Sequence, residues 1–364
     1  MNSTKNISFF DSHFFIGIDT HLKNWKVTIR LNGIELKTLS MNPSPFELYN
    51  YLKRNYPDGI YHLVYEAGFC GFWIQREFKN LGVDCIVVNP ADVPTSNKEK
   101  VNKNDPIDSR KLARELENKS LKGIYIPDIF HEELRHLVRL RFRIVQNQTR
   151  IKNRIKALLY TQGFTIPQNF TGNSRWSAAF IEWLRAINLN TSAGNFSLQN
   201  MIEQLLQLRE HNKNVLRELR RQCKQKEIAI IINSLLSVPG VGFITAITLY
   251  SEIIDMNRFS NDAQTAAFVG LVPSTRSSDD TIYNNGISFR QNKFLRPILI
   301  EAAWTAVRND PAMTLKYKEL TKRMWNIPLA GKSQDAIIRI AKKLLRRIRH
   351  VWLKQEDYVF SLVA

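Results

Sequence analysis

The strand and helix signals in the first third of the chain constrain its fold most. Three strand patterns follow one another as hairpins over residues 14–39, and Asn32-Gly33 supplies a two-residue turn signal between the second and the third. From residue 46 to residue 88, helical patterns alternate with apolar strand patterns. Hairpin strands followed by alternating helices and strands predict a mixed α/β sheet.

Acidic residues stand at the ends of two of these strand patterns and in a helical stretch beyond them. Asp19 and Glu66 each close an apolar strand, and Asp105 and Asp108 lie three apart with Pro106 at a first helical position. A lone strand-end acid is usually a turn residue, and an isolated DxxD is usually a capped surface helix. Together, however, carboxylates at strand ends converge on the crevice of an α/β sheet. Four such oxygen donors can hold two divalent ions for phosphodiester chemistry.

The charge balance indicates a polyanionic partner. Lysine and arginine number 52 against 33 acids, a formal net charge of +19, which favours nucleic acid. No apolar run is long enough to span a bilayer and the amino terminus lacks a signal-peptide layout, so we expect no membrane association. The three cysteines are scattered and the seven histidines show no metal-binding spacing, which favours buried thiols over a disulfide or zinc site.

The middle of the chain predicts two long helices. Residues 131–161 contain no glycine or proline and repeat apolar residues every three or four positions, and 201–222 resume a helical pattern beyond a polar tip. The pair suggests an antiparallel hairpin or a coiled coil, with the apolar stripe packed within the chain or in a dimer. The polar faces carry almost exclusively positive charges. Such a charged face is commonly a solvated surface. Because the mutual repulsion is relieved by a phosphate backbone, we interpret it as a nucleic-acid surface.

Two features of the last third suggest further contacts with phosphate. The PGVG segment at 239–242 is similar to the turn of a helix-hairpin-helix module, where Gly240 and Gly242 let backbone N–H groups approach phosphate, although a simple turn explains it equally well. The helix predicted over residues 332–354 has an apolar half and a basic half. We interpret it as half core and half phosphate-facing.

Several motifs together resemble a family of bacterial insertion-sequence recombinases. The first third carries, in order, the stretches GIDTHLKNW, YEAGFCG, VVNPADV and KNDPIDSRKLA, which resemble the RuvC-like (ribonuclease-H fold) domain of that family. The last third, from SVPGVG through GLVPS to LRPILIEAAW, resembles its C-terminal transposase domain. The resemblance implies a D-E-D-D centre of Asp19, Glu66, Asp105 and Asp108 holding two Mg²⁺ ions. It also implies an element-encoded bridge RNA that directs the choice of DNA.

The same resemblance implies a serine nucleophile. In that family a serine shortly after the GL-x-P motif forms a covalent link to DNA, and Ser278 is the matching position. This chain has Asp279-Asp280 where the family commonly has a glycine, and Gln291 where a glycine is frequent, so Ser277 stays open as the alternative. A serine hydroxyl needs a metal, a base or cationic surroundings to attack phosphate.

The sequence therefore predicts three parts: a RuvC-like metal-dependent domain over 1–125, a basic helical hairpin over 126–225 and a small, mainly helical, serine-bearing transposase domain over 226–364. We expect an RNA-guided recombinase that cleaves and rejoins the DNA of element ends and target, as a dimer or tetramer in the bacterial cytoplasm. The alternatives are a Holliday-junction resolvase using water as nucleophile and a non-catalytic RNA- or DNA-binding protein. The predicted nucleic-acid contacts are Lys103, Arg110, Arg139, Arg143, Arg150, Arg154, Gly240, Gly242, Arg276, Arg290, Lys293 and Arg296.

Overall fold

A computed structural model of the chain describes residues 8–94, 105–172, 175–278, 281–323 and 329–360. Side chains are described for these residues except 105–107, 275–278, 281–285, 323 and 329–332. The chain divides into two compact units, Met1–Ile126 and Pro127–Ala364. The three-part division stays a prediction.

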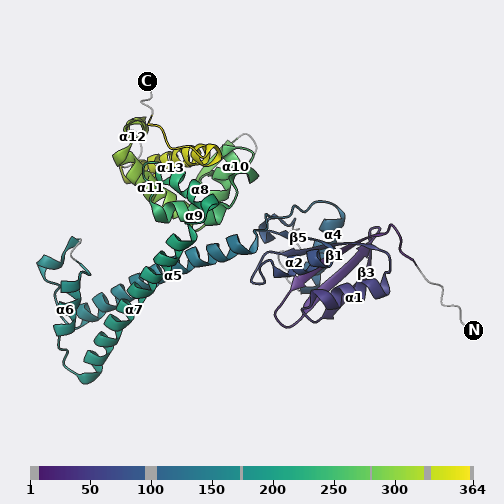
Figure 1. Cartoon of the computed structure of the whole chain (residues 1–364), viewed down its shortest axis with the longest axis horizontal. Coiled ribbons are helices and arrows are strands. Elements are labelled where there is room, and N and C mark those ends of the chain that lie inside the picture. Colours follow the sequence, from purple (N-terminus) through teal and green to yellow (C-terminus); the bar gives the residue numbers. More distant parts are fainter. Residues whose placement is uncertain (1–7, 95–104, 173–174, 279–280, 324–328, 361–364) are drawn as a thin grey trace, which may run out of the picture. The chain divides into compact units, whose positions relative to one another are not determined.

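The first unit is built on a five-stranded mixed sheet (Figure 1). Its elements are β1 (His13–Thr20), β2 (Trp25–Leu31), β3 (Ile34–Met41), α1 (Pro45–Asn55), β4 (Ile60–Glu66), α2 (Trp73–Asn80), β5 (Asp84–Val88) and α4 (Asp105–Glu117). The strand order is β3-β2-β1-β4-β5, with the first three strands antiparallel and β4 and β5 parallel to β1. The predicted mixed α/β sheet is confirmed, and the arrangement is compatible with a ribonuclease-H-like domain.

Side-chain alternation along the strands gives this sheet two apolar faces. One face contributes Ile16, Leu63 and their neighbours to a core with buried residues of α1 and α2. On the other face Val64 packs with Leu112 of α4. The predicted turn between β2 and β3 is present, because Asn32 and Gly33 have positive φ angles of 50° and 78°.

The second unit begins with two long antiparallel helices (Figure 1). Its elements are α5 (Ile129–Thr161), α6 (Ala178–Ala186), α7 (Ser192–Gln222), α8 (Lys226–Leu236), α9 (Phe243–Ile253), α10 (Asp262–Val269), β6 (Pro273–Ser278), β7 (Thr281–Ile287), α11 (Leu295–Asn309), α12 (Pro311–Arg323) and α13 (Leu329–Lys354). Gln148 of α5 donates a hydrogen bond to the Leu208 carbonyl of α7 at 2.9 Å. The far ends of α5 and α7 share a small core with α6, and their near ends pack into the core of the remaining helices.

Two elements of this unit differ from expectation. Helix α7 begins at Ser192, nine residues before the predicted start at 201, because Thr191 caps it by accepting from the Gly194 N–H at 3.1 Å. Within the domain predicted to be mainly helical, the segment from Pro273 forms the two-stranded ribbon β6–β7, in which Ser278 pairs with Thr281. The two strands pair through backbone hydrogen bonds. Because their polar sequence lacks alternating apolar residues, it predicts strands only weakly.

No helix within the described ranges combines the length and the apolar character needed to cross a membrane.

The cysteine side chains differ in accessibility, which gives a testable ranking of thiol reactivity. Cys85 is buried, and desolvation, reinforced by the Asp84 charge, raises the pKa of its thiol; burial raises the pKa of Cys223 to about 11. Because the thiolate is the reactive form, these two thiols stay protonated and unreactive at pH 8. Half-buried Cys70 is expected to be the one fast-reacting thiol, and all three should react in denaturant. Titration with an aromatic disulfide reagent checks this, and a fast phase surviving in Cys70→Ser contradicts it.

Candidate functional site

The strand-end acids lie side by side at one edge of the first unit's sheet. The parallel register of β1 and β4 pairs Gly17 with Val64 and Ile18 with Tyr65, so Asp19 and Glu66 follow at the next position of neighbouring strands, on the face of Gly17 and Val64. This edge is where the carboxyl ends of the central parallel strands meet. The sheet thus brings together two carboxylates that are 47 positions apart in the sequence.

Helix α4 lies directly on β1 and runs antiparallel to it. At Gly17 an added Cβ would lie 2.2 Å from the Ser109 carbonyl oxygen and 2.5 Å from the Ala113 nitrogen, so the helix backbone touches the strand. The last residue of α4, Glu117, accepts from Arg30 Nε at 2.7 Å, beside the amino-terminal half of β1. The first turn of α4 therefore lies toward the carboxyl end of β1.

The predicted DxxD acids occupy that first turn. Asp108 is half-buried and lies one turn before Leu112, which packs on the sheet, and Asp105 is the first residue of α4, where side chains are not described. A hydrogen bond of 2.9 Å between the buried hydroxyls of Thr28 and Ser109 fixes the helix on the sheet. The fold thus directs the α4 amino terminus toward the strand-end acids.

The donor chemistry at this edge fits a hard divalent cation, since carboxylate oxygens are its preferred ligands. Among the residues whose side chains are described, no group of three or more His, Cys, Asp or Glu lies close enough to hold a metal ion. Asp105 belongs to the undescribed side chains, so the complete D-E-D-D set stays a prediction.

The structure adds one residue to this edge that the sequence prediction did not include. His21 Nε2 lies 3.3 Å from Asp19 Oδ2, an arrangement that orients the carboxylate. The sequence signal for His21 is its position two residues after the strand-end acid Asp19. Residues His21 to Asn24 and Phe69 line a shallow pocket of about 370 Å³ just beyond the ends of β1 and β4, where α/β sheets bind ligands.

Three of the predicted nucleic-acid contacts lie exposed along α5. Arg143, Arg150 and Arg154 project into solvent, and Arg150 and Arg154 line a groove of about 320 Å³ between α5 and α7. Polar side chains of α7, including His211, form the opposite wall. This groove offers both cations and hydrogen-bonding groups to a phosphate backbone.

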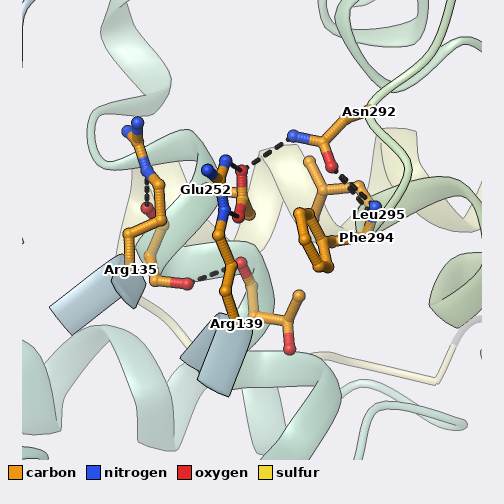
Figure 2. Close-up of polar contacts among 8 residues, drawn as sticks. Arg135, Arg139, Glu252, Asn292, Phe294 and Leu295 are labelled. Atoms are coloured by element: carbon orange, nitrogen blue, oxygen red, sulfur yellow. Dashed lines mark hydrogen bonds and ion pairs between the residues drawn. The ribbon is translucent and has the colours of Figure 1, made fainter. Parts of the chain in front are cut away.

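Two other predicted contacts hold the second unit together. Arg139 donates to the buried carboxylate of Glu252 through Nε at 2.7 Å and Nη2 at 2.9 Å (Figure 2). Arg296 is only 9% exposed, and its Nη2 donates to the carbonyls of Ser288 and Arg290. Both contacts indicate a structural role, and their nucleic-acid role stays a prediction.

The remaining predicted contacts have varied settings. Arg110 pairs with Glu35 at 3.0 Å on the surface of the first unit. Arg290 and Lys293 are exposed in the loop between β7 and α11, with Lys293 over the Phe294 ring. Lys103 lies outside the described residues, and the Arg276 side chain is not described.

The glycines of the PGVG segment have different surroundings. Gly240 has φ +90° and an added Cβ would lie 2.3 Å from the Ala302 carbonyl oxygen, so close packing on α11 accounts for this glycine. Gly242 caps α9 and has open space around it, which leaves the first-turn N–H groups approachable. The predicted phosphate contact therefore rests on Gly242 more than on Gly240.

Ser278 is the last residue of β6, next to the connection to β7. Ser277 pairs with Ile282 and precedes it on the same strand. The side chains of both serines lie outside those described, so the choice between them stays open. The ribbon places either serine at its tip, away from the base where the Ser288 N–H donates to the Val272 carbonyl at 2.9 Å.

Comparison with known proteins adds two family matches. Residues 16–162 match a transposase model of the DEDD type named for IS110, and residues 232–318 match the transposase IS116/IS110/IS902 family. The two matches together cover well over half of the chain.

Individual relatives agree with these matches. A putative transposase, y4qE, of Sinorhizobium fredii is 30% identical over 67% of this chain, which spans 58% of that relative's length. A second putative transposase of the same organism, y4rJ, is 29% identical over 78% of this chain and 74% of the relative. The transposase for insertion sequence element IS1111A of Coxiella burnetii is 28% identical, with 81% of this chain and 79% of the relative covered.

Proposed function

Since this chain belongs to the IS110/IS116 family of transposases, we propose that it moves an insertion element by cleaving and rejoining DNA strands. The observation that carries the proposal is the convergence of Asp19, Glu66 and the first turn of α4 on one sheet edge. The net charge of +19 favours the DNA that such a reaction requires.

The acids form the first half of the proposed machinery. Asp19, Glu66, Asp105 and Asp108 hold two Mg²⁺ ions, which supply polarisation of the scissile phosphate and stabilisation of the leaving oxygen. His21 orients the Asp19 carboxylate through their 3.3 Å contact. The pocket beside His21 and Phe69 gives the DNA strand access to this edge.

Ser278 forms the second half. Its Oγ attacks the scissile phosphorus and loses its proton, the phosphorus–oxygen bond to the leaving strand breaks, and the leaving oxygen takes up a proton. The covalent phosphoserine keeps the energy of the broken bond for rejoining. Exposed Arg290 and Lys293 lie in the loop at the base of the ribbon, where they offer positive charge to the DNA backbone on either side of the reacting phosphate. A position at the ribbon tip suits a residue that must reach a phosphate of the DNA backbone.

Guide RNA and DNA are the proposed partners of the basic hairpin. Arg150 and Arg154 in the α5–α7 groove carry this part of the proposal, together with exposed Arg143. A homo-oligomer, a dimer or a tetramer, brings the ends of the element and its target together. Sequencing the RNA that copurifies with the protein tests the guide.

A covalent-adduct trap tests the nucleophile. Incubation with end-labelled element DNA and Mg²⁺ is expected to give a protein–DNA adduct that resists denaturant and disappears in Ser278→Ala but persists in Ser277→Ala. The reverse pattern assigns Ser277. DNA cleavage that proceeds without any adduct in wild-type protein contradicts the serine mechanism and favours the resolvase reading, with water as the nucleophile.

A further inference from the structure

One buried carboxylate in the second unit joins three separate segments of the chain. Glu252 of α9 is 2% exposed and accepts both the bidentate contact from Arg139 of α5 and a hydrogen bond from Asn292 Nδ2 at 2.9 Å (Figure 2). Asn292 lies in the loop between β7 and α11. Glu252 therefore connects the base of the long helical hairpin to the segment that leaves the serine-bearing ribbon.

Asn292 also fixes this loop to the start of α11. Its Oδ1 accepts from the backbone N–H groups of Phe294 at 2.9 Å and Leu295 at 3.0 Å, which caps the start of α11 (Figure 2). The guanidinium of Arg139 also stacks over the Phe294 ring, with 4.9 Å to the ring centroid. A rotation of α5 would thus displace this loop directly.

The loop in turn forms the base of the ribbon. The Ser288 N–H, one residue beyond β7, donates to the Val272 carbonyl just before β6, and Arg296 of α11 donates to the Ser288 and Arg290 carbonyls. Gly270 makes room for this contact, since a Cβ there would lie 2.5 Å from Arg296 Nη2. The loop at the ribbon base is therefore held both by Arg296 and by the contact of Asn292 with Glu252.

We propose that Glu252 is a positioning residue for strand transfer, which fixes the serine ribbon relative to α5 through Asn292. The inference rests on the proposed function, because it assigns the ribbon to the reaction. A buried bidentate ion pair contributes orientation more than net stability, since its desolvation offsets much of its attraction. Orientation matters here because a displacement of about 1 Å of a reacting group costs roughly a hundredfold in rate.

Two variants separate the arms of this contact. Asn292→Ala removes the link between the loop and Glu252, together with the cap of α11, while the Arg139–Glu252 pair remains; Glu252→Gln keeps the cap and removes the charge that holds both partners. Each is expected to slow adduct formation at saturating DNA by roughly ten- to a hundredfold, with DNA affinity unchanged. Because both act through one contact, the double variant should be no slower than the slower single variant.

Asp310→Asn is the matched control. Asp310 is also a buried carboxylate of this unit, 3% exposed and paired with Arg347, and its contacts among the described side chains are with α12, α13 and Tyr358. It should lower the thermal midpoint at least as much as Glu252→Gln while the adduct rate stays at the wild-type value. An equal loss of rate in Asp310→Asn at equal loss of stability would overturn the proposal.

Hydrogen exchange gives a readout that does not depend on the reaction. The amides of Ser288, Phe294 and Leu295 should exchange faster in Glu252→Gln and Asn292→Ala than in Asp310→Asn. Unchanged exchange in both variants would overturn the positioning role. If wild-type protein forms no Mg²⁺-dependent product, the proposed function fails, and exchange still decides whether Glu252 positions the ribbon.

Discussion

Asp108→Asn is expected to slow Mg²⁺-dependent DNA cleavage by roughly a thousandfold, because losing a metal-ligating carboxylate removes several kcal/mol of transition-state stabilisation. The amide keeps the size of the side chain, so the packing of Leu112 and Ser109 under α4 is unaffected. Asp19→Asn should have a similar effect from the strand side of the same edge. The measurement is the rate of product formation with labelled element DNA, alongside DNA affinity in Ca²⁺, which should not fall.

Asp84→Asn serves as the control for this loss. Asp84 opens β5 at the opposite end of the sheet, where its Oδ2 lies 3.3 Å from His62 Nδ1. It removes one negative charge from the same unit, so any effect of net charge on DNA binding is matched. Full cleavage by Asp108→Asn, or an equal loss of cleavage in Asp84→Asn, would contradict a role of the α4 acids in the reaction.

The sheet and the position of its acids follow from local sequence signals. Apolar runs end at Asp19 and Glu66, and Asn32-Gly33 specifies the hairpin that sets the register of the first strands. Parallel pairing of β1 with β4 then brings the two acids together, as the sequence predicts from strand ends alone. The DxxD helix is found from its spacing and from Pro106 near its start. Its antiparallel path over Gly17 depends on a contact between segments far apart in the chain, which periodicity does not reveal.

The charge pattern of the sequence does not separate structural from exposed arginines. Arg139 and Arg143 lie on one basic helix and share the same one-sign surroundings, yet Arg139 pairs with a buried carboxylate 113 residues away and Arg143 faces solvent. Helical periodicity identifies a face but not the partner that another segment presents to it. The β6–β7 ribbon is likewise not predictable from the sequence, because its polar strands lack the alternation that marks a half-buried strand.

Gly17→Ala is expected to destabilise the first unit by about 3 kcal/mol or more, at the upper end of overpacking costs. The added methyl group would lie 2.2 Å from the Ser109 carbonyl oxygen and 2.5 Å from the Ala113 nitrogen. Both neighbours are helix backbone, which cannot rotate away as a side chain does, so α4 must move off β1 or the unit must unfold. Urea denaturation followed by circular dichroism measures the loss.

The same substitution should also reduce cleavage in the molecules that stay folded, because a shift of α4 carries Asp108 away from Asp19. Asp108→Asn should lose activity without losing stability, whereas Gly17→Ala should lose both. The comparison distinguishes the metal-ligating role of Asp108 from the packing role of Gly17. Gly68→Ala is the matched control, since its added Cβ meets nothing closer than 4.0 Å, at the Glu66 carbonyl oxygen. Wild-type stability of Gly17→Ala would mean that α4 does not rest on β1, and the convergence of the acids would lose its structural basis.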